Sequence, residues 1–464
     1  MTLIKSISGI RGTIGGAPNQ GLTPLDIVKF TSAYAQWILN SNQKAKHIVV
    51  IGRDARMSGN MVNHIVVGTL IGCGINVIDL ELSTTPTVEM AVVDYKASGG
   101  IILTASHNPK QWNALKLLNN KGEFISDLIG KEILNIADKN EFNYAEVNNM
   151  GTYTIDNNYL QKHIEKIIAL SYVDVSLIEK ANFNIVVDAI NSSGSFAVPQ
   201  LLKSLGVKTI TVINNDVTGN FAHNPEPLPE HLTELSKTIL KNKAHLGISV
   251  DPDVDRLAFV CEDGEMFGEE YTLVAVADCV LQNHKKGNTV SNLSSTRALR
   301  DVTEKHGGLY SASAVGEVNV VNMMKETNAV IGGEGNGGII LPELHYGRDA
   351  LVGIAIFLTH LAKFKKPISV LRKSYPNYFI SKNKIELTPQ INVDKVLTEV
   401  EKKYKKQPIN TIDGVKIEFD KEWVHLRKSN TEPIIRIYSE SQTQATAENL
   451  AKKIISDIKE IIKN

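Results

Sequence analysis

One pattern recurs along this 464-residue chain: a short apolar run ends in a loop of small or polar residues. The runs read HIVVIGRD, GGIILTASHN, FNIVVDAINSSGS, HLGISVDPD and NAVIGGEGN. Runs of this length are typical of buried strands. Stretches with helical periodicity lie between them, for example over residues 23–39 and 158–172. Because strands alternate with helices, the pattern predicts parallel α/β sheets with functional loops at the carboxyl ends of the strands.

The chain also changes character along its length, which indicates several domains. A polar, asparagine-rich segment over residues 137–158 separates a first unit from the rest, and a lysine-rich segment over residues 361–379 precedes the last unit. In that last unit, VKIEFDKEWVHLR and IIRIYSES predict strands, and residues 443–464 predict an amphipathic helix. The chain is therefore expected to end in a small α+β domain.

Composition argues against several classes of protein. Lys+Arg and Asp+Glu number 50 each, so the bulk charge gives no reason to expect a nucleic acid or a membrane surface as partner. The first residues lack the apolar region of a secretory signal, and the strongest apolar run, LVGIAIFLTHLA, is too short to span a bilayer. Three cysteines without metal-ligand spacing fit a reducing compartment, so we expect a cytoplasmic protein.

The sequence TASHNP, residues 104–109, places Ser106 beside His107 at the end of one apolar run. A serine hydrolase would need a base aimed at the hydroxyl. Adjacent residues on a strand point to opposite faces, and the GxSxG motif is absent. Asn108-Pro109 alone is typical of an ordinary turn that ends a strand. Acyl transfer is therefore disfavoured, while the choice between a plain turn and another kind of nucleophile stays open.

Three aspartates recur at every second position in HLGISVDPDVDR: Asp251, Asp253 and Asp255. Mg²⁺ prefers oxygen ligands of this type and would offset their mutual repulsion. A calcium EF-hand is a rival interpretation because Glu262 is at the twelfth position, although Arg256 occupies the sixth, where that loop has glycine. An acidic surface turn is a second rival, which the flanking apolar runs disfavour. Since Mg²⁺ often binds phosphate oxygen, phosphate chemistry is the leading hypothesis.

Two further loops carry groups that suit a phosphate and a polyol. VHLRKSNTEPIIRIYSES offers guanidinium, hydroxyl and amide donors that can hold a phosphate, although a polar hairpin would look similar; they are Arg427, Ser429, Asn430, Thr431 and Arg436. VIGGEGNGG matches GxGxxG, but its glycines lead into apolar residues rather than a helix, which weakens a dinucleotide-binding interpretation. This loop presents Glu334 and Asn336, which suit recognition of hydroxyl groups equally well.

Taken in order, these motifs resemble those of the α-D-phosphohexomutase family, whose members move a phosphate between positions 1 and 6 of a hexose. The resemblance runs from SGIRG through TASHNP, DPDVDR and GEGNG to RKSNTEP, and so covers essentially the whole chain. It implies three related α/β domains with mainly parallel mixed sheets and a smaller C-terminal α+β domain around a central cleft. On this sequence the domains would span residues 1–148, 149–256, 257–368 and 369–464.

The resemblance also implies how the reactive groups are used. Ser106 would carry the transferable phosphate and, with the three aspartates, would hold Mg²⁺. Lys116 would act as the base for the sugar hydroxyl. His107 and Arg11 would orient or neutralise the phosphoserine. Arg256 and Arg53 would do similar work, or each would instead form a structural ion pair.

The remaining motifs would bind the substrate. Glu334 and Asn336 would contact sugar hydroxyls, and the phosphate that does not react would bind the loop around Arg427, with Ser429, Asn430, Thr431 and Arg436. The phosphoenzyme would donate to a hexose monophosphate, and the resulting hexose 1,6-bisphosphate would turn over and return its other phosphate to Ser106. No partner is expected beyond the phosphosugar, and the protein would be a monomer or a homodimer.

The loop GEGNGG departs from the common family pattern GExSGH, since Asn336 replaces serine and Gly338 replaces histidine. It is similar to the archaeal-type phosphoglucosamine mutase branch of the family. We therefore expect glucosamine phosphate as the substrate, with mannose or glucose phosphate as the alternative. A catalytically silent protein that binds sugar phosphates is a third interpretation, which the intact Ser106 and aspartates disfavour.

Overall fold

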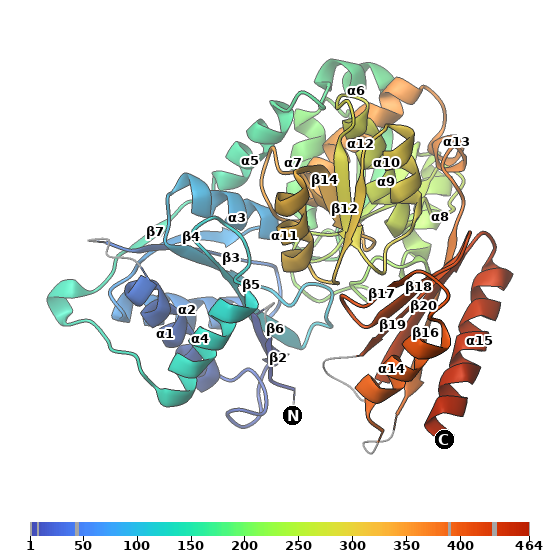
Figure 1. The fold of residues 1–464 in the computed structure, drawn as a ribbon. Coiled ribbons are helices and arrows are strands. Elements are labelled where there is room, and N and C mark those ends of the chain that lie inside the picture. The colour runs from blue at the N-terminus through green and yellow to red at the C-terminus, as the bar shows by residue number, and fades with distance from the viewer. Residues whose placement is uncertain (1, 7–8, 42–45, 388–390, 429–433, 464) are drawn as a thin grey trace.

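The structure is a computed structural model that describes residues 2–6, 9–41, 46–387, 391–428 and 434–463. Within these residues the strands form four sheets, each built from consecutive strands of the chain. Figure 1 shows the first sheet and its helices in blue and teal, the two middle units in green to orange, and the red C-terminal unit beside them. This is the predicted four-domain α/β fold with mixed sheets and a smaller C-terminal domain.

The first sheet has the order β1-β2-β6-β5-β3-β4-β7 and mixes parallel and antiparallel pairs. Its strands are β1 (Ile4–Ser6), β2 (Gly9–Thr13), β3 (Ile48–Arg53), β4 (Asn76–Leu82), β5 (Gly99–Leu103), β6 (Trp112–Leu118) and β7 (Tyr153–Ile155). Its helices are α1 (Pro24–Ser41), α2 (Gly59–Gly72), α3 (Thr85–Asp94) and α4 (Asp127–Lys139).

Helices cover both faces of this sheet because the apolar strands alternate their side chains between two cores. Val49 and Ile51 of β3 belong to the core that contains α1, α2 and α4 residues, whereas Val50 packs with α3. Figure 1 shows α3 on one face and α1, α2 and α4 on the other. The strands expected in HIVVIGRD and before TASHNP are confirmed as β3 and β5.

The second and third sheets repeat one plan: three parallel strands with an antiparallel strand at one edge. The second contains β8 (Asn184–Asp188), β9 (Thr209–Ile213), β10 (Leu246–Val250) and β11 (Leu257–Cys261). The third contains β12 (Asn288–Asn292), β13 (Tyr310–Ser313), β14 (Ala329–Glu334) and β15 (Gly338–Ile340). The sequence predicts that the second domain ends at residue 256. Because β11 pairs with β10, the second sheet continues beyond that residue, and the domain limits stay a prediction.

Most helices of these two units share one core, in which α12 is central, whereas α8 and α11 pack in two smaller cores on the other faces of the sheets. The helices of the two units are α5 (Tyr159–Ile168), α6 (Val175–Ala181), α7 (Gly194–Ser204), α8 (Thr233–Asn242), α9 (Glu269–Leu281), α10 (Ala298–Lys305), α11 (Glu317–Thr327), α12 (Ala350–Phe364) and α13 (Ile368–Lys373). The run LVGIAIFLTHLA lies in α12 and is buried along almost its whole length. None of the helices in the described ranges is both long and apolar enough to cross a membrane.

The C-terminal unit is an antiparallel sheet of order β16-β20-β19-β18-β17, covered by α14 (Val393–Lys403) and α15 (Gln444–Lys463). Its strands are β16 (Phe379–Glu386), β17 (Ile409–Asn410), β18 (Val415–Glu418), β19 (Trp423–Lys428) and β20 (Ile434–Ser441). The segment VKIEFDKEWVHLR forms two antiparallel strands rather than one, because residues 419–422, of which 420–422 are charged, form the turn between them.

Candidate active site

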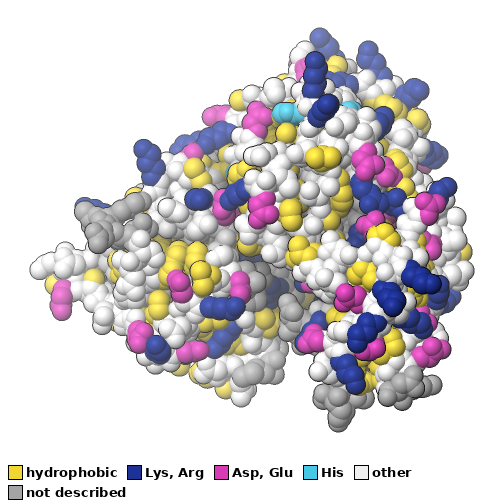
Figure 2. Space-filling view, in the orientation of Figure 1, with side chains coloured by type: hydrophobic (Ala, Val, Ile, Leu, Met, Phe, Trp, Pro, Cys, Tyr) yellow, Lys and Arg dark blue, Asp and Glu magenta, His cyan; other side chains and the backbone are white. Residues whose placement is uncertain are grey.

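Loops at the ends of strands from all four units meet at one cavity of about 420 Å³. A cavity of this size and polar lining suits a small ligand. The predicted residues that line it are Arg11, His107, Arg256, Glu334, Asn336, Arg427 and Arg436. Figure 2 shows that the surface is hollowed between the first unit and the C-terminal unit.

Ser106 follows β5, and its backbone has a φ of +48°, which residues other than glycine rarely adopt. Its backbone N–H donates to Oγ1 of Thr104 (2.9 Å), whose hydroxyl donates to Oδ2 of Asp54 (2.7 Å). The Oγ of Ser106 donates to Oδ2 of Asp251 (2.8 Å). The strained turn thus directs the serine hydroxyl to the loop that follows β10, in the next sheet.

Arg56 holds this turn in place, and the sequence analysis missed it. Its side chain is buried, and Nε lies 3.0 Å from Oδ2 of Asp54. The guanidinium donates to four backbone oxygens around the turn, those of Ser106, Asn108, Pro109 and Trp112. A signal exists in the sequence GRDAR, where an arginine closely follows a predicted strand, but its partners are backbone oxygens that no side-chain motif reveals.

The three aspartates after β10 are buried, and one carboxylate oxygen of each lies within 4.8 Å of the others. Nζ of Lys116 lies 2.8 Å from Oδ2 of Asp253, and Nη2 of Arg348 donates to Oδ2 of Asp255 (2.7 Å). Oδ1 of Asp253 and Oδ1 of Asp255 are buried without a hydrogen-bond partner in the described part of the chain. Converging carboxylate oxygens with unused lone pairs fit a Mg²⁺ ion.

Asp251 and Asp255 have pKa values shifted in opposite directions. Burial, together with Asp255 and Asp253, raises the pKa of Asp251 well above its usual range. Burial also acts to raise the pKa of Asp255, but Arg348 and Lys116 outweigh it, so this pKa lies below its usual value. A bound cation would relieve the repulsion that Asp251 experiences.

Lys116 comes from β6 and is also buried. Burial acts to lower its pKa, but Asp253 and Asp255 outweigh it and raise the pKa above the usual value, which favours the ammonium form. The expected role of this lysine as a base needs the neutral amine, so in this arrangement Lys116 is set up to donate a proton.

His107 and the predicted arginines occupy different surroundings. Nδ1 of His107 lies 3.4 Å from Oγ of Ser106, and burial and Arg256 lower the pKa of His107 to about 2, which keeps the imidazole neutral. Arg256 lies 3.4 Å from Glu226 and 3.9 Å from Asp255. Arg53 instead donates to the backbone oxygen of its neighbour Asp54 (3.4 Å).

The predicted sugar loop begins at the end of β14. Oε1 of Glu334 accepts from Nδ2 of Asn292 (2.9 Å) and from the backbone N–H of Gly316 (3.1 Å). Asn336 faces the cavity and accepts from the backbone N–H of Gly338 (3.2 Å). Because β15 begins at Gly338, where a dinucleotide-binding motif would have a helix, the structure disfavours that interpretation.

Arg348 joins the aspartates to the sugar loop, and sequence analysis missed this residue too. Its guanidinium donates to Asp255 (2.7 Å) and to Oε2 of Glu334 (2.8 Å), and Nε lies 3.0 Å from Oε2 of Glu317. Three carboxylates therefore surround one buried arginine. The signal in the sequence is the arginine of GRD before α12, which no metal or phosphate motif includes.

The C-terminal sheet presents two of the predicted phosphate-binding arginines. Arg427 of β19 lies directly opposite Arg436 of β20 in the strand register, and both line the cavity. Nε of Arg427 lies 2.9 Å from Oδ2 of Asp413. The other predicted residues of this loop, Ser429, Asn430 and Thr431, lie outside the described residues.

The calcium EF-hand interpretation does not match the local structure. β11 occupies the positions where the ligand loop would continue, and Glu262 accepts instead from the backbone N–H of Ser369 (3.1 Å) at the start of α13.

The chain matches family models of phosphoglucomutase/phosphomannomutase in all four units. Alpha/beta/alpha domain I matches residues 3–144, domain II residues 161–264, domain III residues 268–378 and the C-terminal domain residues 387–456. A phosphoglucomutase/phosphomannomutase of Thermococcus kodakarensis is 34% identical over 457 residues, which cover 97% of this chain and 99% of the relative. A probable phosphoglucosamine mutase of Pyrococcus horikoshii is 33% identical over 460 residues, or 98% of each chain.

Solved structures share the fold. A phosphoglucomutase/phosphomannomutase family protein of Burkholderia thailandensis superposes with a TM-score of 0.83 at 23% identity, covering 99% of this chain and 98% of that chain. An N-acetylphosphoglucosamine mutase of Aspergillus fumigatus, solved in complex with GlcNAc-6P and magnesium, has a TM-score of 0.56 at 14% identity, covering 90% of this chain and 84% of that chain.

Proposed function

The chain belongs to the phosphoglucomutase/phosphomannomutase family, and on that premise we propose that it interconverts a hexose 6-phosphate and the corresponding hexose 1-phosphate. The observation that carries this proposal is the contact between Ser106 and Asp251, which joins a candidate phosphate carrier to a buried carboxylate group. The adjoining cavity is lined by His107, which follows Ser106, by the expected sugar loop and by the arginine pair of the C-terminal sheet. One cavity therefore has groups for a reacting phosphate, a sugar and a second phosphate.

In the forward half of the reaction, Ser106 carries the phosphate. An oxygen of the sugar hydroxyl forms a bond to phosphorus while the bond between phosphorus and Oγ of Ser106 breaks. The hydroxyl loses its proton and the departing Oγ gains one, so protons balance across the step. We assign this proton exchange to Lys116, whose Nζ lies 2.8 Å from Oδ2 of Asp253, in the same carboxylate group as Asp251, the partner of Ser106.

The product of this half is a hexose 1,6-bisphosphate. It turns over within the cavity and returns its other phosphate to Ser106, by the reverse of the same bond changes. Arg427 and Arg436 would hold whichever phosphate is not reacting, because two opposed guanidiniums suit a phosphate dianion. His107 and Arg11 would orient the phosphoserine from the wall of the cavity.

Asp251, Asp253 and Asp255 would hold Mg²⁺, together with an oxygen of the Ser106 phosphate. When bound, this ion neutralises charge on the phosphate that otherwise repels an incoming sugar oxygen. The chain contributes the oxygen ligands and keeps them buried, and Arg348 fixes the position of Asp255.

We propose glucosamine phosphate as the substrate, with mannose or glucose phosphate as the alternative. Asn336 and Gly338 in the sugar loop support the first choice, as does the relative named a probable phosphoglucosamine mutase. The relative named phosphoglucomutase/phosphomannomutase supports the second. Rates with the 6-phosphates of glucosamine, N-acetylglucosamine, mannose and glucose, measured side by side, would decide between them.

The mechanism is tested by mass spectrometry and by one substitution. The Ser106 peptide of the purified protein should carry a phosphate, and Ser106→Ala should lower turnover by at least about a thousandfold. Ser98→Ala is a matched control, because Ser98 is a buried serine of the same unit that bonds to His47. Full activity in Ser106→Ala would refute the phosphoserine mechanism, and a phosphorylated but inactive wild type would favour the silent sugar-phosphate-binding protein.

A further inference from the structure

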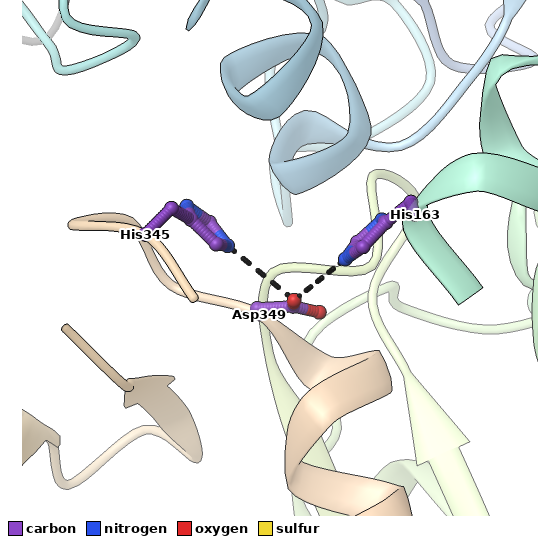
Figure 3. A group of neighbouring side chains, drawn as sticks. All are labelled: His163, His345 and Asp349. Atoms are coloured by element: carbon purple, nitrogen blue, oxygen red, sulfur yellow. Dashed lines mark hydrogen bonds and ion pairs between the residues drawn. The ribbon is translucent and has the colours of Figure 1, made fainter. Parts of the chain in front are cut away.

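A second group of buried ionisable side chains lies apart from the three aspartates. Glu89 comes from α3, His163 from α5, and His345 and Asp349 from the loop before α12. The group thus joins the first unit to the two middle units. Figure 3 shows His163 and His345 reaching toward Asp349 from opposite sides.

Both imidazoles direct the same nitrogen to one carboxylate oxygen. Nε2 of His163 lies 2.9 Å from Oδ2 of Asp349, and Nε2 of His345 lies 3.3 Å from the same atom. The donor atoms of the three residues all lie within 4.8 Å of one another. Ligands bound to a tetrahedral zinc ion at its usual bond lengths are separated by about 3.3 Å, and the two distances from Oδ2 of Asp349 to the imidazole nitrogens are already close to that value.

The other nitrogen of each ring faces an oxygen of its own. Nδ1 of His163 lies 3.0 Å from Oγ1 of Thr87, and Nδ1 of His345 lies 3.4 Å from Oε2 of Glu89. If each Nδ1 carries its proton toward that oxygen, the lone pairs of both Nε2 atoms point at a negatively charged oxygen. That arrangement needs a cation between the three atoms, supplied either by extra protons or by a metal ion.

The charges of the group also call for a cation. Glu89 and Asp349 are buried, and neither forms an ion pair with a lysine or arginine in the part of the chain that the structure describes. Among the described residues, neither carboxylate oxygen of Glu89 has a hydrogen-bond partner. A divalent cation bound to two neutral imidazoles would balance both carboxylates.

We propose that His163, His345 and Asp349 bind a divalent transition-metal ion of the Zn²⁺ class. Imidazole nitrogen suits zinc and its neighbours in the first transition series, whereas Mg²⁺ prefers oxygen, so this site and the aspartate group would select different ions. Glu89 would take an outer position, as carboxylates do around zinc-bound histidine, since its Oε2 lies 3.4 Å from Nδ1 of His345. Thr87 would take the corresponding position beside Nδ1 of His163.

The position of the site gives the ion a structural role. Asp349 caps α12 through the backbone N–H groups of Leu351 (2.8 Å) and Val352 (3.2 Å). It also directly follows Arg348, the residue that joins Asp255 to Glu334. A metal ion here would tie α3 and α5 to this loop and so hold Arg348 in place.

The test is the metal content of the full-length protein. Wild type is mixed with a small excess of Zn²⁺ in a buffer with abundant Mg²⁺, desalted, and analysed by plasma mass spectrometry. We expect about one zinc ion per chain, a higher melting temperature with zinc, and loss of both effects in His163→Gln and His345→Gln. His360→Gln is the matched control, because His360 is a buried histidine outside the proposed site and is hydrogen-bonded to Tyr375 (2.9 Å). This variant should keep its zinc.

A second measurement needs no variant of the site. Wild type loaded with Co²⁺ should show the intense visible absorption bands of a four-coordinate site. Asp253→Asn should keep these bands and the zinc, because the aspartate group is a different site. Wild type that retains neither metal after desalting would overturn the proposal, and so would a loss of zinc in Asp253→Asn with retention in the histidine variants.

Discussion

The Oγ atom of Ser106 lies 2.8 Å from Oδ2 of Asp251, although 145 positions separate the two residues in the sequence. They follow strands of different sheets, so the site depends on how the first two units pack together. Two hydrogen bonds to backbone oxygens hold that packing beside the site. The backbone N–H of Thr85 donates to the backbone oxygen of Asp253 (2.9 Å), and Oγ of Ser193 donates to the backbone oxygen of Ser83 (2.7 Å).

Asp253→Asn should weaken the response to Mg²⁺. Asparagine keeps the shape of the side chain but removes the negative charge that faces Lys116. It also weakens Oδ1, which has no hydrogen-bond partner in the described ranges, as a metal ligand. The Mg²⁺ concentration for half-maximal activity should rise by at least about tenfold, and maximal activity should fall. Asp263→Asn, an exposed aspartate beyond β11, is the control and should behave as wild type. Equal Mg²⁺ curves for the two variants would contradict the assignment of the metal ligands.

Arg56→Lys should destabilise the turn that carries Ser106. A lysine ammonium cannot reach the four backbone oxygens and the carboxylate of Asp54 that the planar guanidinium bonds together. The free energy of unfolding should fall by about 2 kcal/mol or more, and kcat should fall more than KM rises. Denaturant unfolding and steady-state kinetics measure the two effects. Arg53→Lys, at the end of the same strand, should cost little, and similar losses in both variants would argue against a specific role for Arg56.

Much of the site follows from the sequence because its pattern is local. The strand before TASHNP, the strand before DPDVDR and the placement of the three aspartates together could all be predicted from short runs. Arg56 and Arg348 could not, because the partners of each lie in loops that only the packed fold brings near. The raised pKa of Lys116 is also a property of the assembled site, since it arises from aspartates of another unit.

The group around Asp349 shows the same limit. His163 and His345 stand 182 positions apart, and neither belongs to a run with metal-ligand spacing, so nothing local in the sequence relates them. Only the packing of α5 against α12 and of α3 against α5 places both beside one carboxylate.

Arg348→Lys should uncouple the aspartates from the sugar loop. The guanidinium contacts Asp255, Glu334 and Glu317 together, whereas one ammonium group cannot span three carboxylates. We expect kcat/KM to fall by at least about tenfold, because both Asp255 and Glu334 lose a positioning contact. Arg300→Lys is the matched control, since Arg300 pairs with a single carboxylate, Glu418 (2.9 Å). Unchanged kinetics in Arg348→Lys would show that the bridge has no part in turnover.

Lys416→Met should stabilise the protein at neutral pH, and the gain should shrink as the pH rises. Lys416 is buried on β18 with Nζ over the ring of Trp423, and burial lowers its pKa from 10.5 to about 8 despite Glu418 nearby. Between those two pKa values the unfolded chain holds a proton that the folded chain has released, so the stability of wild type rises with pH across this window. At pH values below this window, the folded protein bears the cost of a buried ammonium, about 3 kcal/mol, which methionine avoids. Denaturant unfolding from about pH 7 to about pH 10 measures the difference between variant and wild type, with the exposed Lys421→Met as control. A difference that stays constant over this range would mean that Lys416 keeps its proton in the folded protein.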